Sequence, residues 1–170
     1  PVVEGAKKLY IRAKATSNFA PSDILEYQFA EDVNTPRETY IPISHLSMHA
    51  YSSQSIDSTR PFYAVNAIDG NRNTLWHTDF RYSIVGKRAF ITIKLDSNKY
   101  LSALEYVQKK YRADDPAYIK NAYVYISENG QDWIEAGRLE NAAQDEEFKK
   151  ITFDESVSGQ YVRIDMEGYC

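Results

Sequence analysis

The sequence has very little cysteine, no long apolar run and no excess of positive charge. Its single cysteine is Cys170, so an internal disulfide is excluded, and no cysteine–histidine zinc pattern is present. No run of roughly 20 apolar residues is available to cross a bilayer, and no signal-peptide pattern is found. The net charge of −4 gives no sign of the concentrated positive surface that nucleic-acid binding requires.

The sequence is rich in tyrosine. Fourteen residues are Tyr and 14% are aromatic, whereas only two are Trp. Tyrosine suits half-buried strands and wet recognition surfaces, because its ring is apolar and its hydroxyl is polar. The length of 170 residues fits one domain, or one domain with an appendage. Because the chain starts at Pro1 rather than Met, we expect it to be a piece of a longer protein.

Alternation of apolar and polar residues dominates the chain, and helical periodicity is almost absent. Residues 9–14 and 24–29 alternate in this way and predict a hairpin, and the polar residues 30–39 predict a linker. The hairpin resembles the closing strands of small immunoglobulin-like repeats in secreted bacterial enzymes. We therefore expect residues 1–37 to be an N-terminal hairpin and linker, the remnant of a preceding immunoglobulin-like module, and residues 38–170 to be the main domain.

The main domain contains many short runs with strand character, separated by Gly, Asn, Asp and Pro turns. These runs are residues 46–50, 90–95, 104–108, 122–126, 133–136, 148–153 and 161–166. The pattern predicts an all-β antiparallel sandwich or barrel. Asn129-Gly130 predicts a primed hairpin turn, which needs positive φ angles, and residues 142–150 are the one candidate helix. Trp76 and Trp133 are expected in the core.

The segment around Asp69-Gly70-Asn71 is the most informative part of the sequence. A tight turn there can aim one carboxylate and several backbone carbonyl oxygens at a common point, with the hydroxyl of Thr74 beside them. Calcium prefers six to eight such oxygen ligands. Glu167 is the candidate for a second carboxylate. By local chemistry alone, however, Asp-Gly-Asn is more often an ordinary turn.

Four blocks of sequence, AIDGNRNTLWHTDF, FITIKLD, YVYISENGQDW and YVRIDMEGY, resemble in order and spacing the coagulation factor 5/8 C-type, or discoidin-like, domains. Within that group the chain resembles the family 32 carbohydrate-binding modules of bacterial secreted glycosidases over residues 40–170. The resemblance implies a discoidin-like jelly roll with a structural calcium ion that ties the first loop to the last strand. The calcium ligands that it implies are the carbonyl oxygens of Asn66, Asn71, Thr74 and Met166, the hydroxyl of Thr74 and the carboxylates of Asp69 and Glu167.

The same resemblance implies a sugar site. The family's WHTxW motif presents its histidine and second aromatic to the sugar, and here WHTDF keeps His77 and replaces the second aromatic with Phe80. Lys109 stands where the galactose-type pattern has an arginine, and lysine lacks the planar fork that grips two hydroxyls. The expected ligand is therefore a galactose-, N-acetylgalactosamine-, N-acetylglucosamine- or mannose-type sugar. Further expected contacts are Gln54, Asp114 and Tyr169.

The expected function is that of a non-catalytic module that targets a covalently attached secreted glycosidase to glycans. We expect a monomer outside a bacterial cell, with no nucleic-acid partner and no membrane insertion. One alternative is a discoidin-like module for protein or membrane binding, with Tyr82, Ile84 and Val85 as its apolar loop cluster; another is a structural spacer without a sugar site. An enzyme is disfavoured, because the carboxylates lack glycosidase spacing and the histidines form no metal or nucleophile pattern.

Overall fold

The computed structural model describes residues 8–11, 25–28, 40–56, 61–79, 88–108 and 118–169. The chain divides into two compact units, Pro1–Tyr40 and Ile41–Cys170, which are described separately. In the first unit, strands β1 (Lys8–Ile11) and β2 (Leu25–Gln28) pair antiparallel. The predicted N-terminal hairpin is confirmed. Its origin in a preceding immunoglobulin-like module stays a prediction.

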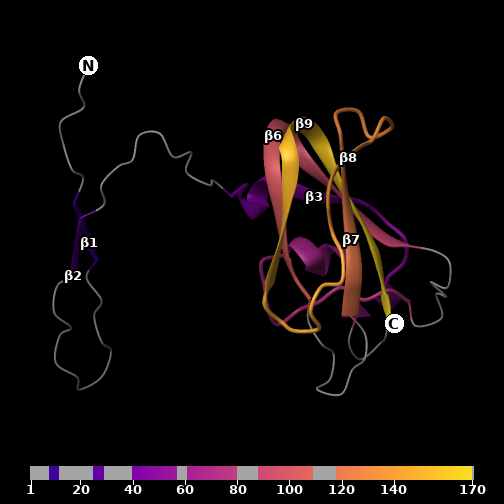
Figure 1. Ribbon diagram of the computed structural model, residues 1–170. Helices are drawn as coiled ribbons and strands as arrows, with labels where there is room; N and C mark the ends of the chain where they lie inside the picture. Colours follow the sequence, from indigo (N-terminus) through magenta and orange to yellow (C-terminus); the bar gives the residue numbers. More distant parts are fainter. Residues whose placement is uncertain are drawn as a thin grey trace, which may run out of the picture. The chain divides into compact units, whose positions relative to one another are not determined.

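The second unit is built on a five-stranded antiparallel sheet with the order β3-β6-β9-β7-β8 (Figure 1). Its strands are β3 (Leu46–Tyr51), β6 (Ala89–Val107), β7 (Tyr118–Ser127), β8 (Ile134–Leu139) and β9 (Phe148–Tyr169). The 3₁₀ helix η1 (Ile43–His45) precedes β3, and a short ribbon of β4 (Ser55–Ile56) and β5 (Pro61–Phe62) and the 3₁₀ helix η2 (Ala64–Ile68) lie between β3 and β6 in the chain. None of the described helices is long and apolar enough to span a membrane.

Strands β6 and β9 are long and bent, and they form both layers of the sandwich. The first part of β6 pairs with the end of β9, and its second part pairs with the start of β9, with a register shift between Lys94 and Lys99. Each long strand was expected as two separate strands. The intervening polar residues 96–98 are exposed and favour turns, so the pattern predicts a break where the strand in fact bends and continues.

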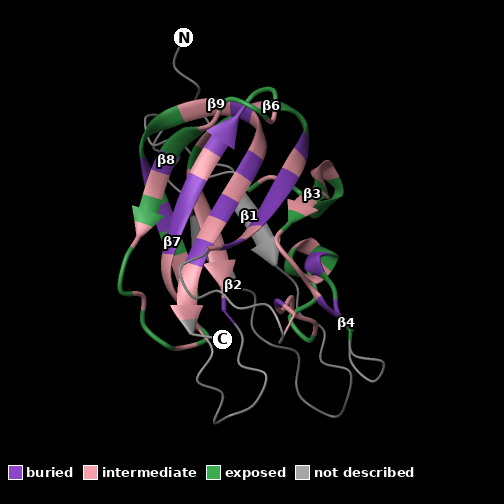
Figure 2. Cartoon of the chain, turned by 90° about the vertical axis from the view of Figure 1, so that its right-hand side faces the viewer, coloured by how far each residue is buried: buried purple, intermediate pink, exposed green. Residues whose placement is uncertain are grey.

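Alternate residues of the sheet face one core, as the buried bands in Figure 2 show. Val162, Ile164 and Met166 of β9 are buried there, and Ile151 and Phe153 from the other half of the same strand belong to the same cluster. The core therefore lies between the two halves of the bent strands. Each large apolar side chain that is fully buried in this way contributes about 1.5–3 kcal/mol. The all-β antiparallel sandwich is confirmed.

Three local expectations have clear outcomes. Residues 142–150 form no helix, because 148–150 are already the start of β9 and 144–147 are bends. The connection between β7 and β8 is the expected tight hairpin, but only Gly130 has a positive φ (77°) there, so the primed turn is wrong. The Oδ1 of Asn129 instead accepts from the backbone N–H groups of Gln131 and Asp132 and makes a side-chain turn. Trp76 packs on the core as expected, and Trp133 is half-buried.

Candidate functional site

The loop after η2 brings several oxygen atoms together. Gly70 turns the chain with a φ of 73°, a conformation that favours glycine. The carboxylate of Asp69 accepts the backbone N–H of Asn71 at 2.8 Å, and its other oxygen lies 2.7 Å from the Thr74 hydroxyl. That hydroxyl also lies 2.7 Å from the carbonyl oxygen of Asn71. Three of the expected calcium ligands therefore share one turn.

The loop half of the expected calcium site fits such an ion. Carboxylate, carbonyl and hydroxyl oxygens are the hard donors that calcium takes, and Asp69 and Asn71 are exposed. Asn66 lies in η2, just before the turn, and its side-chain amide donates to the carbonyl of Leu75 at 3.0 Å. That bond ties the start of the loop to its end, so the backbone around Asp69 is already ordered.

The strand half of the expected site has a different arrangement. The side chain of Met166 is buried in the core, and its backbone stands opposite Ala89 on one side and Ala122 on the other. Glu167, the next residue, points to the outer face of the sheet. One of its carboxylate oxygens accepts from Nε of Arg88 at 2.6 Å. In this arrangement Glu167 meets the cation of Arg88, and the joining of the two halves by one calcium ion stays a prediction.

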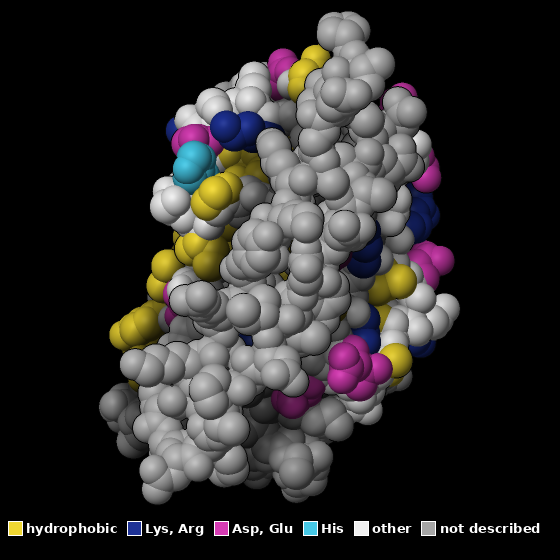
Figure 3. Space-filling view, turned by 90° about the vertical axis from the view of Figure 1, so that its left-hand side faces the viewer, with side chains coloured by type: hydrophobic (Ala, Val, Ile, Leu, Met, Phe, Trp, Pro, Cys, Tyr) yellow, Lys and Arg dark blue, Asp and Glu magenta, His cyan; other side chains and the backbone are white. Residues whose placement is uncertain are grey.

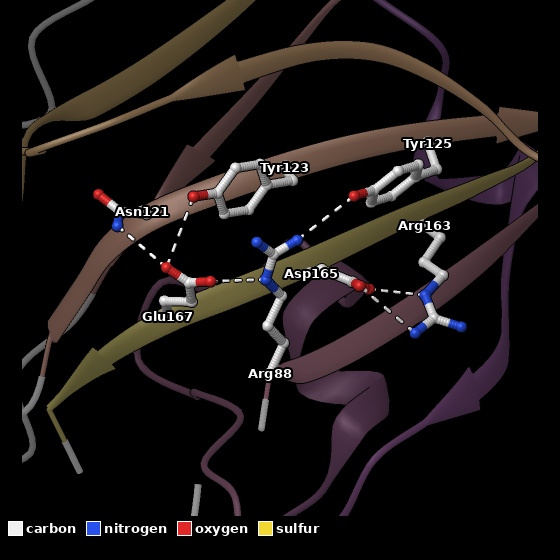
Figure 4. Close-up of polar contacts among 7 residues, drawn as sticks. All are labelled: Arg88, Asn121, Tyr123, Tyr125, Arg163, Asp165 and Glu167. Atoms are coloured by element: carbon white, nitrogen blue, oxygen red, sulfur yellow. Dashed lines mark hydrogen bonds and ion pairs between the residues drawn. The ribbon is translucent and has the colours of Figure 1, made fainter. Parts of the chain in front are cut away.

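The carboxylate of Glu167 is held by a network of polar contacts (Figure 4). Its second oxygen accepts from Nδ2 of Asn121 at 3.1 Å and from the Tyr123 hydroxyl at 3.5 Å. The hydrogen bonds from Asn121 and Arg88 hold the pKa of Glu167 below its ordinary value. Burial lowers the pKa of Arg88, but the bond and the charge of Glu167 outweigh it and raise that pKa overall. Among the residues that the structure describes, no group of three or more His, Cys, Asp or Glu side chains could hold a metal.

Sequence reasoning missed this network. Arg88, Asn121 and Tyr123 come from β7 and from the residue before β6, and nothing in their local sequence marks them as partners of Glu167. The signal that could have found part of it is the alternation along β9. Since Met166 faces the core, Glu167 must face the other way, toward side chains of the neighbouring strands.

The expected sugar contacts that the structure describes lie on a rim of connected loops. The backbone N–H of Ala64 donates to the Oε1 of Gln54 at 2.9 Å, and that of Ser55 donates to the carbonyl of His77 at 2.9 Å. The indole N–H of Trp76 donates to the carbonyl of Ser53 at 3.0 Å. Residues 53–55, η2 and residues 76–77 are thus cross-linked, so Gln54 and His77 are positioned by the same set of bonds.

The ring of His77 has a defined tautomer. Its Nδ1 lies 2.7 Å from the carbonyl oxygen of Thr78, which can only accept, so Nδ1 carries the proton. In the neutral ring, Nε2 is then the acceptor. The ring also lies beside Phe62, with 6.1 Å between the ring centroids. The buried ring of Phe62 thus helps to position the imidazole of His77.

The remaining expected sugar contacts cannot be placed. Phe80, Lys109 and Asp114 lie outside the described residues. Tyr169 is the last residue of β9, opposite Tyr118, and only its backbone is described. Exposed hydrophobic side chains near the rim are Tyr51, Ile56, Tyr63 and Val65. Figure 3 shows hydrophobic side chains reaching the surface on one face of the molecule.

Comparison with known proteins identifies the type of domain. The F5/8 type C domain family matches residues 49–169. No curated protein matches the chain. Among solved structures, the chain is similar to CpGH89CBM32-5 from Clostridium perfringens in complex with GalNAc-β-1,3-galactose, with 22% identity and a TM-score of 0.64 over 75% of this chain and 88% of that one.

Two further solved structures have the same fold. The family 32 carbohydrate-binding module of Clostridium perfringens NanJ, in complex with galactose, has 21% identity and a TM-score of 0.60 over 75% of this chain and 87% of that one. A fragment of a putative chitobiase from Bacteroides thetaiotaomicron has 13% identity and a TM-score of 0.65 over 83% of this chain and 86% of that one. At these identities the likeness concerns the fold.

Proposed function

We propose that this chain, which belongs to the F5/8 type C domain family, is a non-catalytic carbohydrate-binding module that takes a terminal sugar on the loop rim around His77. The observation that carries the proposal is that one set of hydrogen bonds positions both Gln54 and His77 on the rim. With Nδ1 donating to Thr78, the ring presents Nε2 as an acceptor for a sugar hydroxyl. The support from Gln54 and Trp76 holds the rim in place before a ligand arrives, which lowers the entropic cost of binding.

The class of ligand follows from the chemistry of the rim and from the similar structures. A sugar combines an apolar face of C–H groups with a border of hydroxyls, so it needs a hydrophobic contact and a few fixed polar groups. Galactose and GalNAc-β-1,3-galactose are the ligands named for two similar structures. We propose a sugar of galactose, N-acetylgalactosamine, N-acetylglucosamine or mannose type. All four sugar types should be tested, because Lys109 stands where the galactose-type pattern has an arginine.

Binding to a glycan array, followed by isothermal titration with the best sugar, tests the proposal. A shallow site of this kind should bind one sugar with a Kd between about 1 µM and 1 mM. His77→Ala should weaken binding at least about tenfold, because a hydrogen-bonding group fixed on the rim is lost. His45→Ala is the matched control: His45 pairs with Asp96 at 2.7 Å and is not an expected sugar contact, so its loss should leave Kd within about twofold.

The outcomes separate the candidate functions. If the folded wild-type chain binds no glycan, the carbohydrate-binding function is wrong and the spacer alternative is preferred. If His77→Ala binds as tightly as the wild type, a sugar site exists but does not use His77. Sedimentation with anionic liposomes tests the membrane alternative, for which the described residues supply no specific support.

We further propose a calcium ion at the loop half of the expected site. The carboxylate of Asp69 and the oxygens of Asn71 and Thr74 would hold it, and the ion would stabilise the bend that precedes the rim. An ion present at a hundred times its Kd should stabilise the fold by about 2.7 kcal/mol. Calcium should therefore raise Tm in the wild type but not in Asp69→Ala. An equal rise in both would exclude the Asp69 loop as the calcium site.

The biological setting of the module is also a proposal. We propose that it is attached to a glycoside hydrolase outside a bacterial cell and acts as a monomer, because weak single-site binding gains by tethering a catalytic partner to its substrate. Size-exclusion chromatography with light scattering tests the monomer. Comparing a longer chain that contains the catalytic partner, with and without this module, on insoluble glycan tests the attachment.

A further inference from the structure

The outer face of the sheet carries an ion pair that the sugar site does not use. It lies where the end of β9 meets the start of β6 on one side and β7 on the other (Figure 4). Nε of Arg88 lies 2.6 Å from a carboxylate oxygen of Glu167. The two side chains are 36% and 37% exposed, so the pair is only partly screened by water.

Both partners are held in place by further contacts. The guanidinium of Arg88 stacks over the ring of Tyr123 at 3.8 Å and lies 3.4 Å from the hydroxyl of Tyr125. The second oxygen of Glu167 accepts from Asn121 and from Tyr123. The carboxylate therefore has a donor at each oxygen, and the guanidinium has a ring, a hydroxyl and a carboxylate around it.

We propose that Arg88 supplies the positive charge that neutralises Glu167, and that Glu167 takes no part in calcium binding. Two arguments lead to this. A calcium ion placed at this carboxylate would stand next to a guanidinium, and like charges at such a distance repel. In addition, both carboxylate oxygens of Glu167 already accept hydrogen bonds, one from Arg88 and the other from Asn121 and Tyr123.

The consequence is that the junction of β6, β9 and β7 is held without a metal. Calcium, if it binds the Asp69 loop, acts there alone, and its removal leaves the Arg88–Glu167 pair intact. This inference does not depend on sugar binding. It also separates two residues that the family resemblance places in one site, Asp69 and Glu167.

Thermal unfolding of the full chain in calcium and in EDTA tests the proposal. Glu167→Gln should lower Tm by about 1–4 °C, because a half-exposed ion pair is lost, and by the same amount in both solutions. The rise in Tm on adding calcium should be unchanged in this variant. Loss of that rise in Glu167→Gln would make Glu167 a calcium ligand and overturn the proposal.

Glu155→Gln is the matched control, since Glu155 is an exposed carboxylate on the same strand. It should leave Tm within about 1 °C of the wild type. If Glu155→Gln and Glu167→Gln behave alike, the pair contributes nothing and the proposal is wrong. Arg88→Met combined with Glu167→Gln should lower Tm by less than the sum of the single changes, because the two residues act on each other.

A measurement on the unaltered chain covers the case in which the variants fail to fold. The Nε–H proton of Arg88 should be visible by NMR and protected from solvent exchange in EDTA, and calcium should leave its chemical shift unchanged. A large shift of that proton on calcium addition would mean that the ion displaces Arg88 from Glu167, and would overturn the proposal.

Discussion

Gln108 offers the sharpest test of how the sheet is fastened near the candidate site. It follows the end of β6 and is only 8% exposed. Its Oε1 accepts the backbone N–H of Ile119 at 3.0 Å, and its Nε2 donates to the carbonyl of Ala143 at 2.5 Å. One side chain thus connects the end of β6, the start of β7 and the segment that leads into β9.

Gln108→Met keeps the length and most of the volume of the side chain but removes both bonds. Each backbone group would lose its side-chain partner in a poorly solvated place, at about 1–3 kcal/mol apiece. The packing of the methionine recovers part of this, so we expect a loss of about 2–4 kcal/mol. For a domain of this size that corresponds to a fall in Tm of about 4–16 °C. Urea denaturation followed by tryptophan fluorescence measures the loss directly.

Gln108→Glu tests the two hydrogen bonds of Gln108 one at a time, because it keeps the bond from Ile119 and removes the bond to Ala143. Its carboxylate still accepts from Ile119 but faces the carbonyl of Ala143, so the charged form is disfavoured and the folded-state pKa of the new side chain should be raised. The stability of this variant should then be greatest at acidic pH, where a protonated carboxyl can donate to Ala143, and should fall as pH rises through the raised pKa. Gln131→Met, at an exposed turn position, is the control and should change little. A loss below about 0.5 kcal/mol in Gln108→Met would refute the reasoning.

Three further predictions concern the core. Tyr106→Phe should raise stability slightly, by about 1 kcal/mol, because the buried Tyr106 hydroxyl has no hydrogen-bond partner among the described residues. Burial raises the pKa of Tyr106 to about 12, so the wild type should lose stability as pH rises from about 10 toward 12, and the variant should lose less, as pH-dependent urea denaturation will show. Ile126→Ala, at a residue with 0% exposure, should cost about 2–5 kcal/mol in urea denaturation, whereas Ile134→Ala, 60% exposed, should cost under about 1 kcal/mol. Gly159→Ala should lower Tm by several degrees, because an added Cβ would lie 2.2 Å from Cγ2 of Ile126, and an unchanged Tm would show that β7 and β9 can separate there.

Much of the fold could be predicted from the sequence because its signals are local. The period-two alternation at Ile91, Ile93 and Leu95 recurs in Val162, Ile164 and Met166, and each set does lie in the core. The bends could not be predicted in the same way. A polar run such as residues 96–98 has the same composition whether the chain leaves the sheet or turns within it, and only the pairing of Lys99 with Gly159 decides between them.

The same difference between local and long-range signals decides which parts of the candidate site could be predicted. Asp69, Asn71 and Thr74 lie within six positions of one another, so a single glycine turn brings their oxygens together and the sequence is enough to predict it. Glu167 is different, because its neighbours are chosen by strand pairing rather than by spacing in the chain. Asn121 stands opposite Glu167 only in the register that β7 and β9 adopt.

A one-residue slip in that register would send Glu167 into the core and Met166 to the surface, where Arg88 would have no carboxylate to pair with. The burial of Met166 and the ion pair of Glu167 are therefore two outcomes of one pairing choice. For the same reason, the charge of Glu167 is satisfied by whatever the adjacent strands present, and in this chain they present a guanidinium stacked on an aromatic ring. A family motif that names a carboxylate at this position predicts where the carboxylate stands, but the neighbouring strands determine which cation it meets.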